Sequence, residues 1–197
     1  MLLGRRPSRD QWANAYVFPG GRVDPSDSRV RPASPLRPHV EACLTRAASE
    51  ARARALAIAA VRELFEETGL LLAKEGLPLN RHSPTWRGFA ERGLAPDLEP
   101  LDLLCRAITP PYRPKRFNAR FFVADAEHAQ GRLGGSGELV DLRWFSIDEA
   151  RALNLPNITV RVLVELEEWL TEEPKRTAQG RTPVFKMIHG VHQRLLE

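Results

Sequence analysis

The chain has 197 residues, of which 43% are hydrophobic and 27% are charged, a composition that fits a single folded domain over residues 1–197. The formal net charge is +4, but no arginine-rich arm with interleaved aromatics is present and the basic residues are spread along the chain, so a small phosphate-bearing partner explains the charge as well as nucleic acid does. No apolar run is long enough to span a membrane, and Cys43 and Cys105 lack the spacing of a zinc site or a disulfide framework, so we expect a cytoplasmic protein with reduced thiols.

The first third of the chain predicts two short strands, a glycine turn and a long helical region. Residues 1–6 and 15–18 are typical of strands, and the Pro19-Gly20-Gly21 turn lets the backbone approach a ligand closely. Residues 25–38 are rich in Pro, Ser and Arg and predict a loop. Residues 39–68 then predict a helix with a break near 47–49.

The end of this helical region carries a group of acidic side chains on one face. At the helical period, Glu63, Glu66 and Glu67 are neighbours, while an apolar stripe on the opposite face suits burial against a sheet. That stripe consists of Ile58, Val61, Leu64 and Phe65. Gly69 follows the pattern and predicts the end of the helix, because glycine accepts the left-handed conformation there.

Such an acidic face has two interpretations. Like charges at i and i+4 destabilise a helix by about 0.2–0.5 kcal/mol per pair, and a bound hard cation such as Mg²⁺ or Mn²⁺ would offset this repulsion. The alternative is a solvated acidic surface, which is what most runs of charge are. The three acids alone leave both interpretations open.

The remainder of the chain predicts alternating strands and helices. Strands are expected over 70–73, 101–108, 116–124 and 139–145. A helix over 84–92 would bury Trp86 and Phe89, and Ser146 would cap another helix, with Glu149 completing a capping box. Two closing helices are expected over 158–170 and 185–196. This mixture predicts the α/β (α+β) class.

Residues 62–70, Arg-Glu-Leu-Phe-Glu-Glu-Thr-Gly-Leu, resemble the second half of the box that marks the Nudix hydrolases, R-E-U-x-E-E-x-G-U with U aliphatic. The first half, G-x5-E, is represented by Gly21 and Asp27. Two departures are visible: Asp27 stands where Glu is usual, and residues 28–61 separate the halves where the usual box has seven residues. A split box of this kind resembles the coenzyme A diphosphatase-like branch.

The resemblance implies a fold, a metal site and a set of site residues. The fold would be a Nudix-type α/β/α sandwich with a mixed sheet between helices. Mg²⁺ or Mn²⁺ would be held by Glu63, Glu66, Glu67 and the carbonyl of Gly20. The catalytic group would comprise Glu63, Glu67, Arg62 and Glu138, with Arg62 orienting a glutamate and Glu63 or Glu138 accepting the proton of the attacking water.

Two further regions lie outside the box. Residues 28–54 are interpreted as an insertion within it, either a surface elaboration or a lid or groove for an acyl chain, and the surface elaboration is the simpler reading. Residues 154–197 are interpreted as a C-terminal helical extension, where the resemblance becomes thin.

Secondary signals concern the substrate. Residues 115–122 resemble a K-R-F-D-T-x-F-F stretch of the same branch, with Asn118 and Ala119 in place of the acid and threonine. Arg116 and Arg120 would share a strand face and grip a substrate phosphate, or would simply solvate an exposed strand. Glu138 lies on a glycine-rich loop and resembles an acid that many Nudix enzymes bring toward the helix.

The function predicted from these residues is metal-dependent hydrolysis of a nucleoside diphosphate linked to another group. The resemblance favours coenzyme A or acyl-CoA, cleaved to 3′,5′-ADP and (acyl-)4′-phosphopantetheine. One alternative is a hydrolase of ADP-ribose or dinucleoside polyphosphates; another is a Nudix-fold module that binds a nucleotide without cleaving it. The expected partner is therefore a small molecule, not nucleic acid or membrane, and a homodimer and a monomer are both left open.

Overall fold

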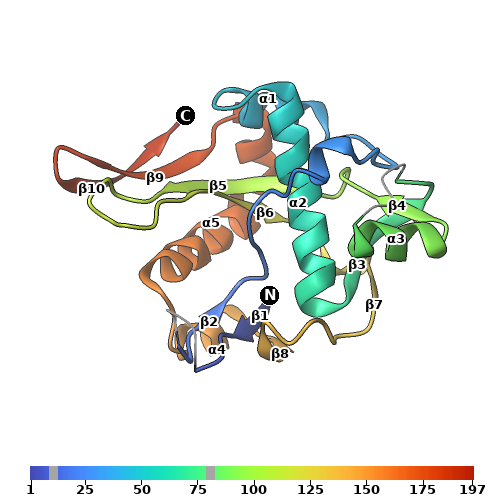
Figure 1. Cartoon of the computed structure of the whole chain (residues 1–197). Coiled ribbons are helices and arrows are strands. Elements are labelled where there is room, and N and C mark those ends of the chain that lie inside the picture. The colour runs from blue at the N-terminus through green and yellow to red at the C-terminus, as the bar shows by residue number, and fades with distance from the viewer. Residues whose placement is uncertain (9–12, 79–82) are drawn as a thin grey trace.

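The computed structural model describes residues 1–8, 13–78 and 83–197, with the backbone alone for residues 172–179. Strands and helices alternate along the chain, and the mixed α+β class is confirmed (Figure 1). Within the described residues, no helix has the length and apolar character that crossing a bilayer requires.

The strands of the described residues form three sheets. The first is antiparallel with the order β2-β1-β8, made of Tyr16–Val17, Leu2–Arg5 and Val140–Trp144. The second has the order β10-β9-β5-β6, made of Val191–Leu196, Pro183–Ile188, Asp102–Ile108 and Asn118–Val123. The third, β4-β3-β7, contains Leu94–Pro96, Leu70–Glu75 and Ala129–Gly131.

Two helices cover opposite faces of the β5–β6 ladder and create a layered arrangement (Figure 1). Because side chains alternate along a strand, Leu103 and Phe122 face the core cluster of α2 (Glu50–Thr68), while Leu104 and Phe121 face the cluster of α5 (Asn157–Gln179). The sheet thus holds α2 in a fixed position through the apolar face of the helix.

The predicted helical region 39–68 consists of two helices joined by a short break, as expected. These are α1 (Pro38–Thr45) and α2, which begins after the N-cap Ser49. Residues 50–54 of the predicted insertion therefore belong to the first turns of α2. The 3-10 helix η1 (Asp27–Arg29), at the start of the predicted insertion, packs against α2, as does α1.

The predicted helix 84–92 is confirmed as α3 (Pro84–Glu91), and Trp86 and Phe89 are both fully buried. The ring of Phe89 packs edge-on against Phe65 of α2 at a centroid distance of 5.4 Å. This contact holds α3 against the end of α2 that carries the glutamates.

The C-terminal region agrees with the prediction only in part. Ser146 caps α4 (Ile147–Arg151) in a capping box with Glu149, and α5 covers the predicted helix 158–170. The predicted helix over 185–196 is wrong, because β9 and β10 form an antiparallel hairpin there. The turn residues His189 and Gly190 both have positive φ, which suits a two-residue hairpin turn, and β9 gains a parallel partner in β5. The extension 154–197 is thus one helix after α4 followed by a hairpin.

Candidate active site

The acidic face lies on the last turns of α2. The helix ends at Gly69, whose φ is 76° and whose N–H donates to the Phe65 carbonyl at 2.8 Å, as the sequence predicted. Of the three glutamates, Glu67 is 2% exposed, whereas the side chains of Glu63 and Glu66 are 13% and 34% exposed. The three carboxylates thus differ in their access to solvent although they share one helix face.

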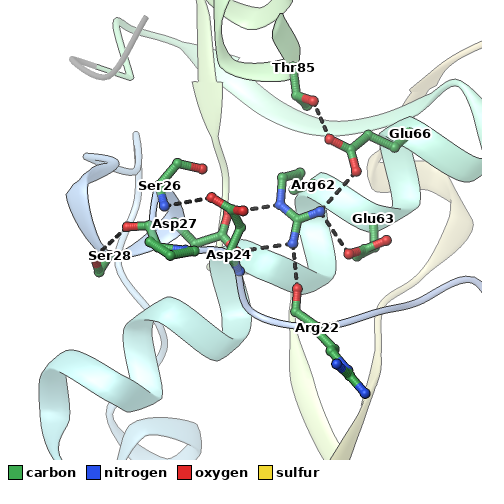
Figure 2. Close-up of polar contacts among 10 residues, drawn as sticks. Arg22, Asp24, Ser26, Asp27, Ser28, Arg62, Glu63, Glu66 and Thr85 are labelled. Carbon is green, nitrogen blue, oxygen red and sulfur yellow. Dashed lines mark hydrogen bonds and ion pairs between the residues drawn. The ribbon is translucent and has the colours of Figure 1, made fainter. Parts of the chain in front are cut away.

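Arg62 organises the two outer glutamates (Figure 2). Its Nη1 donates to Glu63 Oε1 at 2.7 Å and to Glu66 Oε2 at 2.8 Å. Its Nε and Nη2 donate to both oxygens of Asp27 at 2.9 and 3.1 Å, and Nη2 also donates to the Arg22 carbonyl at 2.7 Å. Every N–H of the guanidinium therefore has an acceptor, and the group orients carboxylates.

Asp27 brings the two halves of the box together. It is completely buried and forms an ion pair with Arg62, although 34 residues lie between them in the sequence. The Asp24 N–H donates to Asp27 Oδ2 at 2.8 Å, which fixes the carboxylate at the start of η1. The shorter side chain of aspartate reaches the guanidinium because η1 packs directly on α2.

The glycine turn lies against the same helix. The Gly20 N–H donates to Glu67 Oε2 at 2.7 Å. At Gly21, a Cβ atom would lie 2.4 Å from Glu63 Oε1, far inside van der Waals contact. A residue with a side chain at this position would displace Glu63, so the turn requires glycine for its close approach.

A second glycine-rich segment holds the end of α2 through backbone contacts. The N–H groups of Gly134 and Ser136 donate to the carbonyls of Thr68 and Glu66, both at 2.8 Å, and so satisfy acceptors that a helix end leaves free. A Cβ at Gly135 would lie 2.2 Å from the Glu67 carbonyl oxygen. Glu138 lies three residues after Gly135 and two residues before the start of β8.

The pKa values of two glutamates on the acidic face are raised by burial and by neighbouring carboxylates. The pKa of Glu67 is raised to about 7, chiefly by burial, with a smaller contribution from the charges of Glu63 and Glu138. The Gly20 N–H and the charge of Arg6 oppose this rise. Burial also raises the pKa of Glu63, opposed by Arg62 and reinforced by Glu66 and Glu138. Glu138 is thus close enough for its charge to act on both.

These donors are hard carboxylate oxygens, which is the ligand set that Mg²⁺ and Mn²⁺ prefer. Burial is the main cause of the raised pKa values of Glu63 and Glu67, and a cation would relieve the carboxylate repulsion that adds to it, so the residues present fit such an ion. Within the part of the chain that the structure describes, no three acidic, His or Cys side chains converge on one point. Instead Glu66 turns toward Arg62 and Thr85, and Glu67 toward Gly20.

The two arginines predicted to grip a phosphate have different surroundings. Arg116 is exposed and precedes β6, beside Phe117, whose ring lies under the guanidinium of Arg22 at 5.5 Å. Arg120 is half-buried within β6 and donates to the carbonyls of Asn118 at 2.7 Å and Ala47 at 3.4 Å. Both line a cavity of about 2450 Å³ that also includes Glu63, Glu66, Glu67 and Glu138.

Three contacts of the site were not predicted from the sequence. The Thr85 hydroxyl donates to Glu66 Oε1 from the first turn of α3 (Figure 2). The charge of Arg6, at the end of the first strand, acts on Glu67. Ala47, Ala48 and Arg52 of the predicted insertion line the cavity. None of these residues belongs to a motif, and only the tertiary packing around α2 could have indicated them.

Comparison with known proteins gives one family match and two similar proteins. The NUDIX domain family matches residues 49–166, a range that begins at the N-cap of α2 and covers more than half of the chain. The Caenorhabditis elegans protein named "Putative nudix hydrolase 7" is 26% identical over 168 residues, which are 77% of this chain and 49% of that protein. The chain thus spans about half the length of that curated relative.

A solved structure extends the likeness to the fold. The crystal structure of a NUDIX hydrolase from Alicyclobacillus acidocaldarius has a TM-score of 0.61 and 30% sequence identity, over 83% of this chain and 81% of that one. The family match includes the acidic face of α2 and the segment that carries Glu138, and the structural match covers most of the sheets and helices described above. The chain therefore belongs to the Nudix family.

Proposed function

We propose that this chain is a metal-dependent hydrolase that cleaves a nucleoside diphosphate linked to another group. The observation that carries the proposal is the Arg62 centre, which rejoins the two halves of the box and orients Glu63 and Glu66 beside the buried Glu67. A module that only binds nucleotides has no need of three carboxylates held on one helix face, so this arrangement favours catalysis over binding alone.

Mg²⁺ or Mn²⁺ would be held by Glu63, Glu66, Glu67 and the carbonyl of Gly20. When bound, the ion supplies neutralisation of phosphoryl charge and a water of lowered pKa. Glu63 or Glu138 accepts the proton of the attacking water, and Arg62 keeps Glu63 and Glu66 in place without contacting the substrate.

The proposed substrate is coenzyme A or an acyl-CoA, split at the diphosphate into 3′,5′-ADP and a 4′-phosphopantetheine. The split box and residues 115–122 support this choice. Arg116 lies beside Phe117, which contacts Arg22 of the glycine turn, and is suited to the 3′-phosphate that ADP-ribose lacks. ADP-ribose or a dinucleoside polyphosphate is the second candidate, because the acidic face would serve any such diphosphate.

The test is hydrolysis of coenzyme A, 3′-dephospho-CoA and ADP-ribose at fixed salt, with and without Mg²⁺ or Mn²⁺. We expect metal-dependent turnover with the highest kcat/KM for coenzyme A, and a loss of at least about a hundredfold in Glu67→Gln. Glu50→Gln, at the exposed start of the same helix, is the matched control and should retain activity. A higher kcat/KM for ADP-ribose than for coenzyme A would show that coenzyme A is not the preferred substrate. Full activity of Glu67→Gln would show that the assignment of the active site is wrong.

A further inference from the structure

One stripe of α2 faces the cavity along almost the whole helix. Arg52, Leu56, Ala60 and Glu63 all line the cavity, and their spacing places them on one helix face. The stripe has a cation at one end, apolar side chains in the middle and the carboxylates at the other end. Because each helical residue adds 1.5 Å, the backbone positions of Arg52 and Glu63 are about 16 Å apart.

Positive charge collects at the Arg52 end of the cavity. Arg120 of β6 lies on the same wall, where burial and the charges of Arg106 and Arg52 lower its pKa. Arg106 is compensated by Glu197 at 3.0 Å and Asn118 at 2.7 Å. Among the described residues, no carboxylate forms an ion pair with Arg52 or Arg120, and Arg120 donates only to carbonyl oxygens. The charge of Glu197 also acts on Arg120, but one carboxylate faces three guanidinium groups, so this end of the cavity has an excess of positive charge.

We propose that Arg52 and Arg120 form a second anion-binding site, which holds an anionic group at the far end of the substrate's acyl-phosphopantetheine arm. The inference rests on the proposed function, and it specifies the substrate class as acyl-CoA with a terminal carboxylate. Ala47 and Ala48 of the insertion line the cavity beside this site. Arg120 contacts this segment, because its Nη2 donates to the Ala47 carbonyl.

The length of the ligand supports this assignment. The arm of coenzyme A runs through about thirteen bonds from phosphorus to sulfur, and at roughly 1.2 Å per bond of an extended chain it reaches about 16 Å. A thioester bound at its diphosphate by the acidic face thus brings its acyl group to Arg52. The side chains of α2 lean toward its N-terminus, so the guanidinium of Arg52 lies beyond the thioester, where a terminal carboxylate would be.

The 3′-phosphate of coenzyme A cannot fill this site. It is about six bonds from the nearer phosphorus of the diphosphate, a reach of about 7 Å by the same measure. The middle of the stripe is also apolar, because Leu56 and Ala60 separate the two charged ends. An uncharged arm that ends in a carboxylate matches a cavity wall whose middle is apolar and whose far end is cationic. A polyphosphate does not match it, because it would place charge against the apolar middle.

The experiment compares glutaryl-CoA with pentanoyl-CoA, two thioesters with equal carbon number that differ in a terminal carboxylate. We expect the parent chain to prefer glutaryl-CoA by about tenfold or more in kcat/KM, because a hydrogen bond to a charged group contributes on this scale. Arg52→Gln should lose most of this preference and keep its rate with pentanoyl-CoA. Arg54→Gln is the matched control, since Arg54 is exposed two residues away and does not line the cavity.

Calorimetric binding of both thioesters in EDTA gives a readout without catalysis. In Arg52→Gln, the Kd of glutaryl-CoA should rise, whereas the Kd of pentanoyl-CoA should stay the same. The double variant Arg52→Gln/Arg120→Gln, checked for folding by thermal unfolding, should bind the two thioesters equally. If the preference persists in the double variant, or if the parent chain hydrolyses both thioesters equally, the second site is wrong and the proposed function stands. If no CoA compound is hydrolysed, the proposed function is wrong and this inference falls with it.

Discussion

Thr85 shows how a single hydroxyl outside the box acts on the acidic face. Glu66 is held at both oxygens, since Oε2 accepts from Arg62 and Oε1 accepts from Thr85. Each carboxylate oxygen has a second lone pair, so both contacts are compatible with a metal ligand. Groups that orient a metal ligand in this way commonly contribute about ten- to hundredfold to metal affinity.

We expect Thr85→Val to weaken Mn²⁺ binding by about tenfold, because Glu66 loses one of the two donors that fix its rotamer. Calorimetric titration of the purified chain with Mn²⁺ measures this directly. Thr85→Ser keeps the hydroxyl and should restore the affinity. Thr45→Val is the matched control, because the Thr45 hydroxyl donates only to carbonyls of α1. Equal Mn²⁺ affinity in Thr85→Val and Thr45→Val would contradict the assignment.

Among the structural elements, the glycine-rich segment before β8 depends on one close backbone approach. At Gly135, φ is 105° and an added Cβ would meet the backbone of Glu67, which cannot move without disturbing α2. Gly137 also has a positive φ, of 86°, but an added Cβ there has no neighbour within 4 Å. An alanine at Gly135 would therefore meet both a steric clash and an unfavourable φ, whereas an alanine at Gly137 would meet only the unfavourable φ.

Gly135→Ala should lower hydrolytic activity about as much as Glu138→Gln does, because the segment detaches and carries Glu138 away from Glu63 and Glu67. Its free energy of unfolding should fall further than that of Gly137→Ala, which shares only the backbone penalty of about 1–2 kcal/mol. Urea unfolding and initial rates measure the two effects. Identical behaviour of the two alanine variants would show that the contact with Glu67 has no role.

The elements that the sequence predicted are those with a local cause. The acidic helix, its end at Gly69 and the capping box at Ser146 follow from periodicity and capping chemistry, which act over a few residues. The residues 185–196 were misassigned because Leu195 and Leu196 fit a helical pattern equally well, and the deciding contact is the parallel pairing with β5, about 80 residues earlier. Thr85 and Arg52 share this difficulty, since only tertiary packing brings them to the site.

For the whole molecule, the buried acid links stability to pH. Glu67 has a pKa of about 7 in the folded chain against an ordinary value of 4.5, chiefly because of burial. Between these values the folded state binds a proton that the unfolded state has released, so stability falls as pH rises through this window. The difference is on the order of 3 kcal/mol at most, lost fully above about pH 7.

We therefore expect the metal-free chain to be less stable near pH 8 than near pH 5, as measured by urea unfolding in EDTA. Glu67→Gln removes the titrating group and should flatten this dependence. Mn²⁺ should raise the unfolding temperature more near pH 8 than near pH 5, because metal binding and proton binding compete for the same carboxylates. A parent chain whose stability is the same at both pH values in EDTA would contradict the assignment of the buried acid.

The ion pair between Asp27 and Arg62 connects the two departures of the box. Aspartate is shorter than glutamate by one carbon–carbon bond, about 1.5 Å, so the backbone that carries it must come closer to α2 by that amount. A connection of 34 residues imposes almost no constraint on this approach, whereas a connection of seven residues fixes where the acid can lie. During divergence the length of the connection and the choice of acid are therefore expected to change together, with aspartate following the long connection and glutamate the short one.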